Sequence, residues 1–156
     1  MSLVEPLART TIFVRDFERS LAFYRDLLGL SVLFDITLPN PSASQITNEN
    51  AEALRIIVLT AGDTEIGNIG LAQPLGANPP LPHRPIPERI TFGETCLVIR
   101  TQHLKTLLPK LRVHPGVHLI SEPTQILGRG GRELWEIFAR DPDGVLVNLA
   151  YVGPWE

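Results

Sequence analysis

Cysteine is almost absent from this chain, and its one copy, Cys96, stands inside an apolar run. No intramolecular disulfide can form, and Cys96 is expected to pack as a small hydrophobe. Long apolar runs are also missing, so no signal peptide or spanning helix is indicated and a cytoplasmic protein is expected. Positive charge is not in excess, because the net charge is -3. Neither nucleic acid nor a membrane is therefore an expected partner.

Proline, by contrast, is abundant: the chain has 14, and they cluster in residues 74–87. Proline removes amide donors and fixes the backbone, so neither a helix nor a central strand can pass through that stretch. With 44% apolar and 20% charged residues among 156, the chain suits one compact domain with an ordinary core. We expect a single domain, 1–156, built of modules 5–75 and 90–153 that the Pro-rich connector 74–89 joins.

The first module reads as one strand, one helix and three further strands. Asp16 stands where a helix N-cap belongs, and Gly29 stands just past the expected last turn. Phe17, Leu21 and Tyr24 share one face of that helix. Alternating or β-branched residues predict strands at 7–14, 31–36, 54–60 and 66–72. The polar stretch 39–50 is expected to be a loop.

The second module repeats the order. Apolar and β-branched runs predict strands at 94–100, 117–121, 133–140 and 145–152. Leucines at helical spacing mark a helix after residue 103, which Pro109 should kink or shorten. The unit βαβββ thus occurs twice, and the fold class expected is α+β.

Two motifs resemble the signatures of one family. Residues 13–30 read FVRDFERSLAFYRDLLGL, and residues 138–149 read FARDPDGVLVNL. They are similar to the opening and closing signatures of vicinal-oxygen-chelate proteins, the glyoxalase/bleomycin-resistance/dioxygenase superfamily. The resemblance covers roughly residues 7–152 and implies two βαβββ modules that form a curved mixed sheet around a cleft. It also implies a homodimer and a small-molecule ligand.

The same resemblance implies four positions for metal ligands in the cleft. The first falls seven residues before the aspartate that opens the helix, which gives Arg9. Its counterpart in the second module is Glu94. The position four residues after the glycine of the DPDG turn is Asn148. The remaining position is Gly70, or Asn68 if the alignment shifts by two residues on the same strand face.

These four residues are a poor ligand set for a transition metal. A guanidinium has no lone pair to offer, and an amide oxygen is a weak neutral ligand. We therefore expect no metal and no cofactor. Arg9 and Glu94 could form a buried ion pair that fills the vacated site, or Arg9 could replace the charge of the metal and bind a carboxylate or enolate of a ligand.

Trp135 adds a candidate aromatic contact. On the expected strand it shares a face with Glu133 and Ile137, while Glu136 and Phe138 share the other face. It could stack on a planar ligand in the cleft, or it could be a core aromatic. The candidate ligand-binding residues are therefore Arg9, Asn68, Trp135 and Asn148.

Three functions compete. The first is a metal-independent protein that binds a small aromatic or carboxylate ligand, as in the bleomycin-resistance branch. The second is a lyase or isomerase of the lactoylglutathione-lyase type, with Glu94 as general base but without the Lewis acid that would stabilise an enediolate. A dioxygenase fits least, because it needs two histidines and a carboxylate on one face. Whether the chain is an enzyme stays open at this point.

Overall fold

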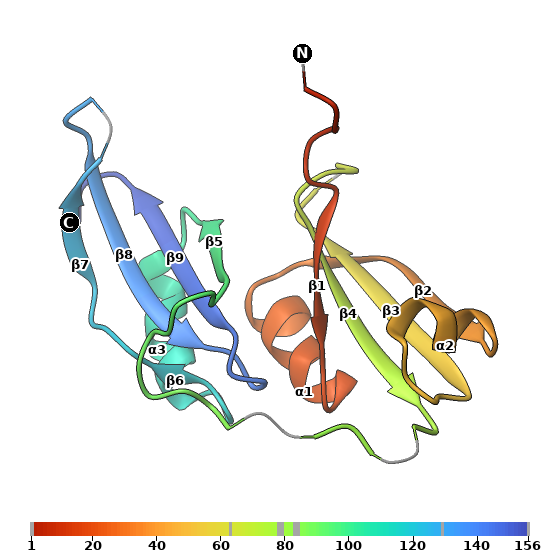
Figure 1. The fold of residues 1–156 in the computed structure, drawn as a ribbon. Coiled ribbons are helices and arrows are strands. Elements are labelled where there is room, and N and C mark those ends of the chain that lie inside the picture. The colour runs from red at the N-terminus through yellow and green to blue at the C-terminus, as the bar shows by residue number, and fades with distance from the viewer. Residues whose placement is uncertain (1, 63, 78–79, 83–84, 129, 156) are drawn as a thin grey trace. The chain divides into compact units, whose positions relative to one another are not determined.

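The structure, a computed structural model, describes residues 2–62, 64–77, 80–82, 85–128 and 130–155. The chain divides into two compact units, Met1–Arg84 and Pro85–Glu156, with the boundary in the Pro-rich connector. Each unit has its own sheet, and helices pack on both (Figure 1). The predicted α+β class is confirmed. In the part of the chain that is described, no helix has the length and apolarity to cross a membrane.

The sheet of the first unit has four strands in the order β1-β4-β3-β2. Their bounds are Arg9–Phe13 for β1, Ser31–Pro39 for β2, Ala53–Thr60 for β3 and Asn68–Leu75 for β4. The β1 and β4 strands are parallel, and the other two pairings are antiparallel. Because the chain enters through β1 and leaves through β4, these parallel neighbours carry residues from both ends of the unit.

The helix predicted after Asp16 is present, but it changes type. It runs as α1 (Phe17–Leu21) and continues as a π-helical stretch, η1 (Ala22–Leu27). The Asp16 side chain accepts hydrogen bonds from the amides of Glu18 and Arg19 at 2.9 and 3.3 Å, so the predicted N-cap is confirmed.

The prediction of a loop at 39–50 is wrong in one respect, because this stretch contains the helix α2 (Ser42–Thr47). Six residues are too few to show a helical period, and α2 is held by tertiary packing instead. Its Ala43 is fully buried in a cluster with apolar side chains of the sheet. The members of that cluster on the sheet are Leu54, Ile56, Val58 and Ala72, with Leu38 packed against them.

The two helices of this unit lie on opposite faces of its sheet. The guanidinium carbon of Arg55 lies 4.9 Å from the centre of the Phe17 ring of α1. Arg55 shares its face of the sheet with Ile57 and Leu71. The alternate residues Val58, Gly70 and Ala72 point to the face that α2 covers. Arg9, Thr11 and Phe13 share the α2 face, because β1 pairs them with Asn68, Gly70 and Ala72.

The sheet of the second unit has the order β5-β9-β8-β6, and a further strand, β7, pairs with β8. The bounds are Cys96–Arg100 for β5, His118–Leu119 for β6, Thr124–Leu127 for β7, Glu133–Arg140 for β8 and Leu146–Val152 for β9. Three expectations were wrong here: β5 begins after Glu94, β6 has only two residues, and β7 was not foreseen. The residues of β7 are all exposed, so they carry no alternating pattern.

The helix α3 (Leu104–Val113) lies behind β8 and β9 in the view of Figure 1. Leu104, Leu107 and Leu111 are its buried residues. Pro109 was expected to kink or shorten the helix; it stands inside α3 and does not end it. Because Pro109 is exposed, water can hydrogen-bond the backbone carbonyl that loses its amide donor.

Candidate functional site

Two of the predicted site residues, Arg9 and Asn68, lie side by side in the first unit. They are register partners at the start of the parallel strands β1 and β4. Two backbone hydrogen bonds hold this corner: Gly67 N donates to Leu7 O at 3.1 Å, and Asn68 N donates to Ala8 O at 3.0 Å. Of the two residues that the sequence left open for the later-strand position, Asn68 is the register partner of Arg9, and Gly70 is the register partner of Thr11.

A pocket of about 360 Å³ opens at this corner. Its polar lining comes from Arg9, Glu65 and Asn68, and its apolar lining comes from Ala8, Leu33, Phe34 and Val58. The α2 cluster includes Val58, so α2 covers the sheet face up to the pocket and leaves the Arg9 end open. We call this cavity the Arg9 pocket.

Gly70 makes room for the arginine. A Cβ atom built on Gly70 would lie 2.9 Å from the Thr11 hydroxyl and 3.5 Å from Arg9 Cδ. The aliphatic stem of Arg9 therefore passes over the backbone of Gly70. A metal-ligating side chain in place of Gly70 would press its Cβ against the Thr11 hydroxyl, so the glycine keeps this space open beside Arg9.

The amide of Asn68 is fixed and only half satisfied. The residue is 6% exposed, and its Nδ2 donates to Thr64 O at 3.2 Å. Its Oδ1 is buried and has no hydrogen-bond partner among the residues that the structure describes. Buried polar atoms are nearly always paired, so an unpaired acceptor on a residue that lines a pocket points to a donor supplied from outside, which a small shift of the Asn68 side chain would reach.

Charges of both signs border the Arg9 pocket. Arg9 is exposed and makes no ion pair with any described residue. Glu65 lines the same pocket from the segment that leads into β4. A guanidinium in this position can accept an anionic group by two parallel hydrogen bonds.

Glu94, the predicted general base, has a partner within its own unit. Its carboxylate forms a buried ion pair with the guanidinium of Arg140, at the end of β8, and the two side chains are 5% and 1% exposed. The amide of Thr91 also donates to Glu94 Oε2 at 3.2 Å. Arg140 further donates to the backbone carbonyls of Gly144, at 3.0 Å, and Arg89, at 3.4 Å. One of the two readings of the sequence paired Glu94 with Arg9, and within its own unit Glu94 is paired with Arg140.

Asn148 lies in β9 of the second unit and is 2% exposed. Its Nδ2 donates to Glu136 Oε2 at 3.1 Å, and its Oδ1 has no partner among the described residues. Cys96 shares this face of the sheet, since β5 and β9 pair Cys96 with Leu146. Burial raises the pKa of the Cys96 thiol above its ordinary value of 9.0, and nearby Glu136 adds to the effect.

Trp135 lies on the opposite face of that sheet from Glu136 and Asn148. Its ring packs on Trp155, with 4.9 Å between centroids, and Lys105 of α3 lies 5.2 Å from the Trp155 ring. The helix α3 therefore covers the face that Trp135 occupies. Of the candidate contacts, Arg9 and Asn68 are brought together, Glu94 and Asn148 lie in the other unit, and Trp135 lies among aromatic residues near α3.

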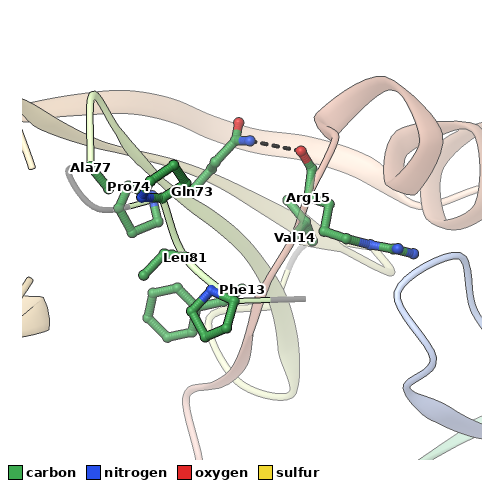
Figure 2. A pocket seen from close by; sticks show the side chains of 9 residues that line it. Phe13, Val14, Arg15, Gln73, Pro74, Ala77 and Leu81 are labelled. Carbon is green, nitrogen blue, oxygen red and sulfur yellow. Dashed lines mark hydrogen bonds between the residues drawn. The ribbon is translucent and has the colours of Figure 1, made fainter. Parts of the chain in front are cut away.

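A second pocket, of about 310 Å³, lies at the other end of β1 and β4 (Figure 2). Figure 2 shows the Gln73 amide donating to the Arg15 carbonyl, at 2.8 Å, on one side of it. Its lining is mostly apolar and includes prolines of the connector, and it contains none of the predicted site residues. The full lining is Phe13, Val14, Arg15, Gln73, Pro74, Ala77, Pro80, Leu81 and Pro82. This pocket shows how the connector packs on the first unit, and we assign it no ligand.

The donors at the four implied positions do not fit a transition metal. Arg9 is a cation, and the carboxylate of Glu94 is already bound by a second guanidinium. The two asparagines offer only neutral amide oxygens. Across residues 2–62, 64–77, 80–82, 85–128 and 130–155, no three His, Cys, Asp or Glu side chains are grouped so that they could hold a metal ion.

Two residues of these sites were missed from the sequence. Arg140 stands directly before the DPDG turn at the end of an apolar strand, and an arginine so placed needs a buried anion or solvent. Glu65 gave no signal, because only the turn between β3 and β4 brings it to the pocket.

Comparisons with known proteins agree with this fold. The family model described as Glyoxalase/Bleomycin resistance protein/Dioxygenase superfamily matches residues 7–149. Among curated proteins, none is similar enough in sequence to count as a match.

Two solved structures give the scale of the similarity. A glyoxalase family protein from Bacillus cereus superposes with a TM-score of 0.75 at 18% identity, and the match covers 98% of this chain and 97% of that one. The trypanothione-dependent glyoxalase I of Leishmania major gives a TM-score of 0.62 at 20% identity, with 95% and 87% covered. At such identities the likeness concerns the fold. The family model, which covers most of the chain, shows that this protein belongs to the glyoxalase/bleomycin resistance/dioxygenase superfamily.

Proposed function

We propose that this member of the superfamily binds a small organic carboxylate in the Arg9 pocket and does so without a metal. The observation that carries the proposal is the position of Arg9, an arginine without an ion-pair partner among the described residues, beside the orphaned acceptor of Asn68. The family resemblance implies that relatives which use a metal have a metal-ligating residue at the position of Arg9. A guanidinium supplies the positive charge that a substrate oxygen would otherwise find on the metal.

The rest of the pocket supports a ligand with an apolar part. Leu33, Phe34 and Val58 form a wall against which an alkyl or aromatic group can be buried. A volume of about 360 Å³ suits a compact ligand, since small-molecule sites usually span roughly 300–1,000 Å³. Burial of the apolar group would provide affinity, and Arg9 would fix the orientation.

The alternative, a lyase or isomerase with Glu94 as general base, has less support. A base must accept a proton from the substrate, and the Glu94 carboxylate already accepts hydrogen bonds from Arg140 and from the backbone of Thr91. The residues at the four implied positions do not fit a metal, so they imply no Lewis acid that would stabilise an enediolate intermediate.

The test is ligand binding to an Arg9→Met variant, with 3-phenylpropanoate as the probe. The loss of charge-assisted hydrogen bonds of about 1.5–3 kcal/mol should weaken binding by roughly 10- to 100-fold, measured by titration calorimetry or ligand-observed NMR. Arg19→Met, on exposed α1 surface, removes the same charge and should leave the affinity unchanged. Equal affinity of wild type and Arg9→Met would refute the proposal, as would stoichiometric zinc, nickel or iron in untagged protein.

A homodimer is a further part of the proposal. The edge strand β2 exposes Val32, Leu33, Phe34 and Ile36, and exposed apolar side chains along a strand edge are commonly buried at interfaces. Light scattering coupled to gel filtration should give the mass of two chains, and the mass of one chain would contradict the expectation.

A further inference from the structure

The Arg9 pocket has a second polar requirement that a plain carboxylate does not meet. Asn68 Oδ1 is buried without a donor among the described residues, and its amide cannot turn to relieve this without breaking the bond from Nδ2 to Thr64 O. A carboxylate is itself an acceptor, so it can satisfy Arg9 but not Asn68. The ligand must therefore also carry a hydrogen-bond donor.

The charge of Glu65 indicates what kind of donor this is. Glu65 lines the pocket with Arg9, so the protein contributes one negative and one positive group to the same small volume. A neutral hydroxyl would satisfy Asn68 and leave Glu65 opposite the ligand's own negative charge. An ammonium group donates to Asn68 and is attracted by Glu65 at the same time.

The spacing of the two groups limits the fragment that carries them. Arg9 and Asn68 are register partners on neighbouring strands, which lie about 4.8 Å apart. Their side chains share one face of the sheet, and the backbone bonds from Gly67 and Asn68 to β1 hold the strands in place. Both side chains line the Arg9 pocket, so a compact fragment that carries an ammonium and a carboxylate, such as an α-amino acid, can reach both.

We propose that the ligand class is an α-amino carboxylate with an apolar side chain: the carboxylate on Arg9, the ammonium between Asn68 Oδ1 and Glu65, and the side chain against Phe34 and Val58. This inference rests on the proposed function, because it keeps Arg9 as the anchor of the carboxylate. It adds that the pocket recognises a zwitterion, which explains why Glu65 and the orphaned Asn68 acceptor are both there.

The experiment compares three probes that differ only in their charged groups. L-phenylalanine carries both, 3-phenylpropanoate lacks the ammonium, and 2-phenylethylamine lacks the carboxylate. Wild-type protein should bind phenylalanine at least about tenfold more tightly than either of the others, since each lacks one charge-assisted contact. Calorimetric titration or saturation-transfer NMR gives the ratios.

Glu65→Gln is the decisive variant, because Glu65 is exposed and its loss does not disturb the core. It should reduce the preference for phenylalanine over 3-phenylpropanoate and leave 3-phenylpropanoate binding unchanged or stronger. Glu49→Gln, also exposed in the first unit but outside the pocket, is the matched control and should keep the preference.

The outcomes separate this inference from the function on which it rests. If phenylalanine binds no better than 3-phenylpropanoate while Arg9→Met weakens both, the zwitterion inference is overturned and carboxylate binding stands. If Glu65→Gln leaves the preference intact, the ammonium does not lie against Glu65, and the inference fails as well. If Arg9→Met changes neither affinity, or no probe binds, both proposals fail.

Discussion

Replacement of Arg140 by methionine should destabilise the second unit strongly. Arg140 and Glu94 are 1% and 5% exposed, so the variant leaves a carboxylate that is buried without its counter-charge. Removal of one partner of a buried pair costs about 3–5 kcal/mol, far more than the pair itself contributes over an apolar replacement. The carbonyls of Gly144 and Arg89 also lose a donor, which places the expected loss in the upper part of that range.

Urea unfolding followed by tryptophan fluorescence measures this loss in the intended unit, since the chain has two tryptophans and both, Trp135 and Trp155, lie in residues 85–156. The double variant Glu94→Gln/Arg140→Met should be about 1–3 kcal/mol more stable than the two single losses together predict.

Arg112→Met is the control. Arg112 pairs with Glu122 on the surface, where the two side chains are 51% and 68% exposed, and its loss should cost less than about 1 kcal/mol. An Arg140→Met variant within about 0.5 kcal/mol of wild type, or strict additivity in the double variant, would refute the reasoning. Glu94 and Arg140 would then not be the buried, energetically coupled ion pair described above, and Glu94 would again be a candidate base.

Three smaller predictions concern other sites. Asp16→Ala removes the cap of α1 and should lower the free energy of unfolding by about 1 kcal/mol in urea titrations. Arg55 lowers the pKa of Asp35 below its usual 3.8, so this pair should stabilise the wild type over Asp35→Asn by less than about 1 kcal/mol at pH 7 and lose that advantage as the pH falls below about 4. Because burial raises its pKa above 9.0, Cys96 should react slowly with iodoacetamide at pH 8 and faster only at higher pH; rapid alkylation at pH 8 would contradict this.

The sequence by itself determined most of the architecture. The alternation in 7–14 and the apolar, β-branched run at 54–60 predict strands, because both patterns depend only on local geometry and residue type. The N-cap at Asp16 is a local feature as well, since the carboxylate reaches amides two and three residues away. The duplication and the two end motifs identified the superfamily, and counting back from Asp16 located Arg9 on the first strand.

Tertiary structure decided the partners of these residues. Glu94 and Arg140 are 46 residues apart, and no local rule states which of the chain's arginines a buried glutamate will meet. Which of Gly70 and Asn68 stands beside Arg9 depends on the register of two parallel strands, and what covers the face of Trp135 depends on the position of α3.

The Arg9 pocket shows both sides of this division. Its arginine was found by sequence spacing, because the fold fixes the distance from the helix start to the first strand. Its glutamate and its unpaired amide oxygen were not, because hydrogen-bond satisfaction and pocket lining are properties of segments that meet in space. A local sequence pattern predicts the backbone conformation, but only packing determines which charged side chains come together.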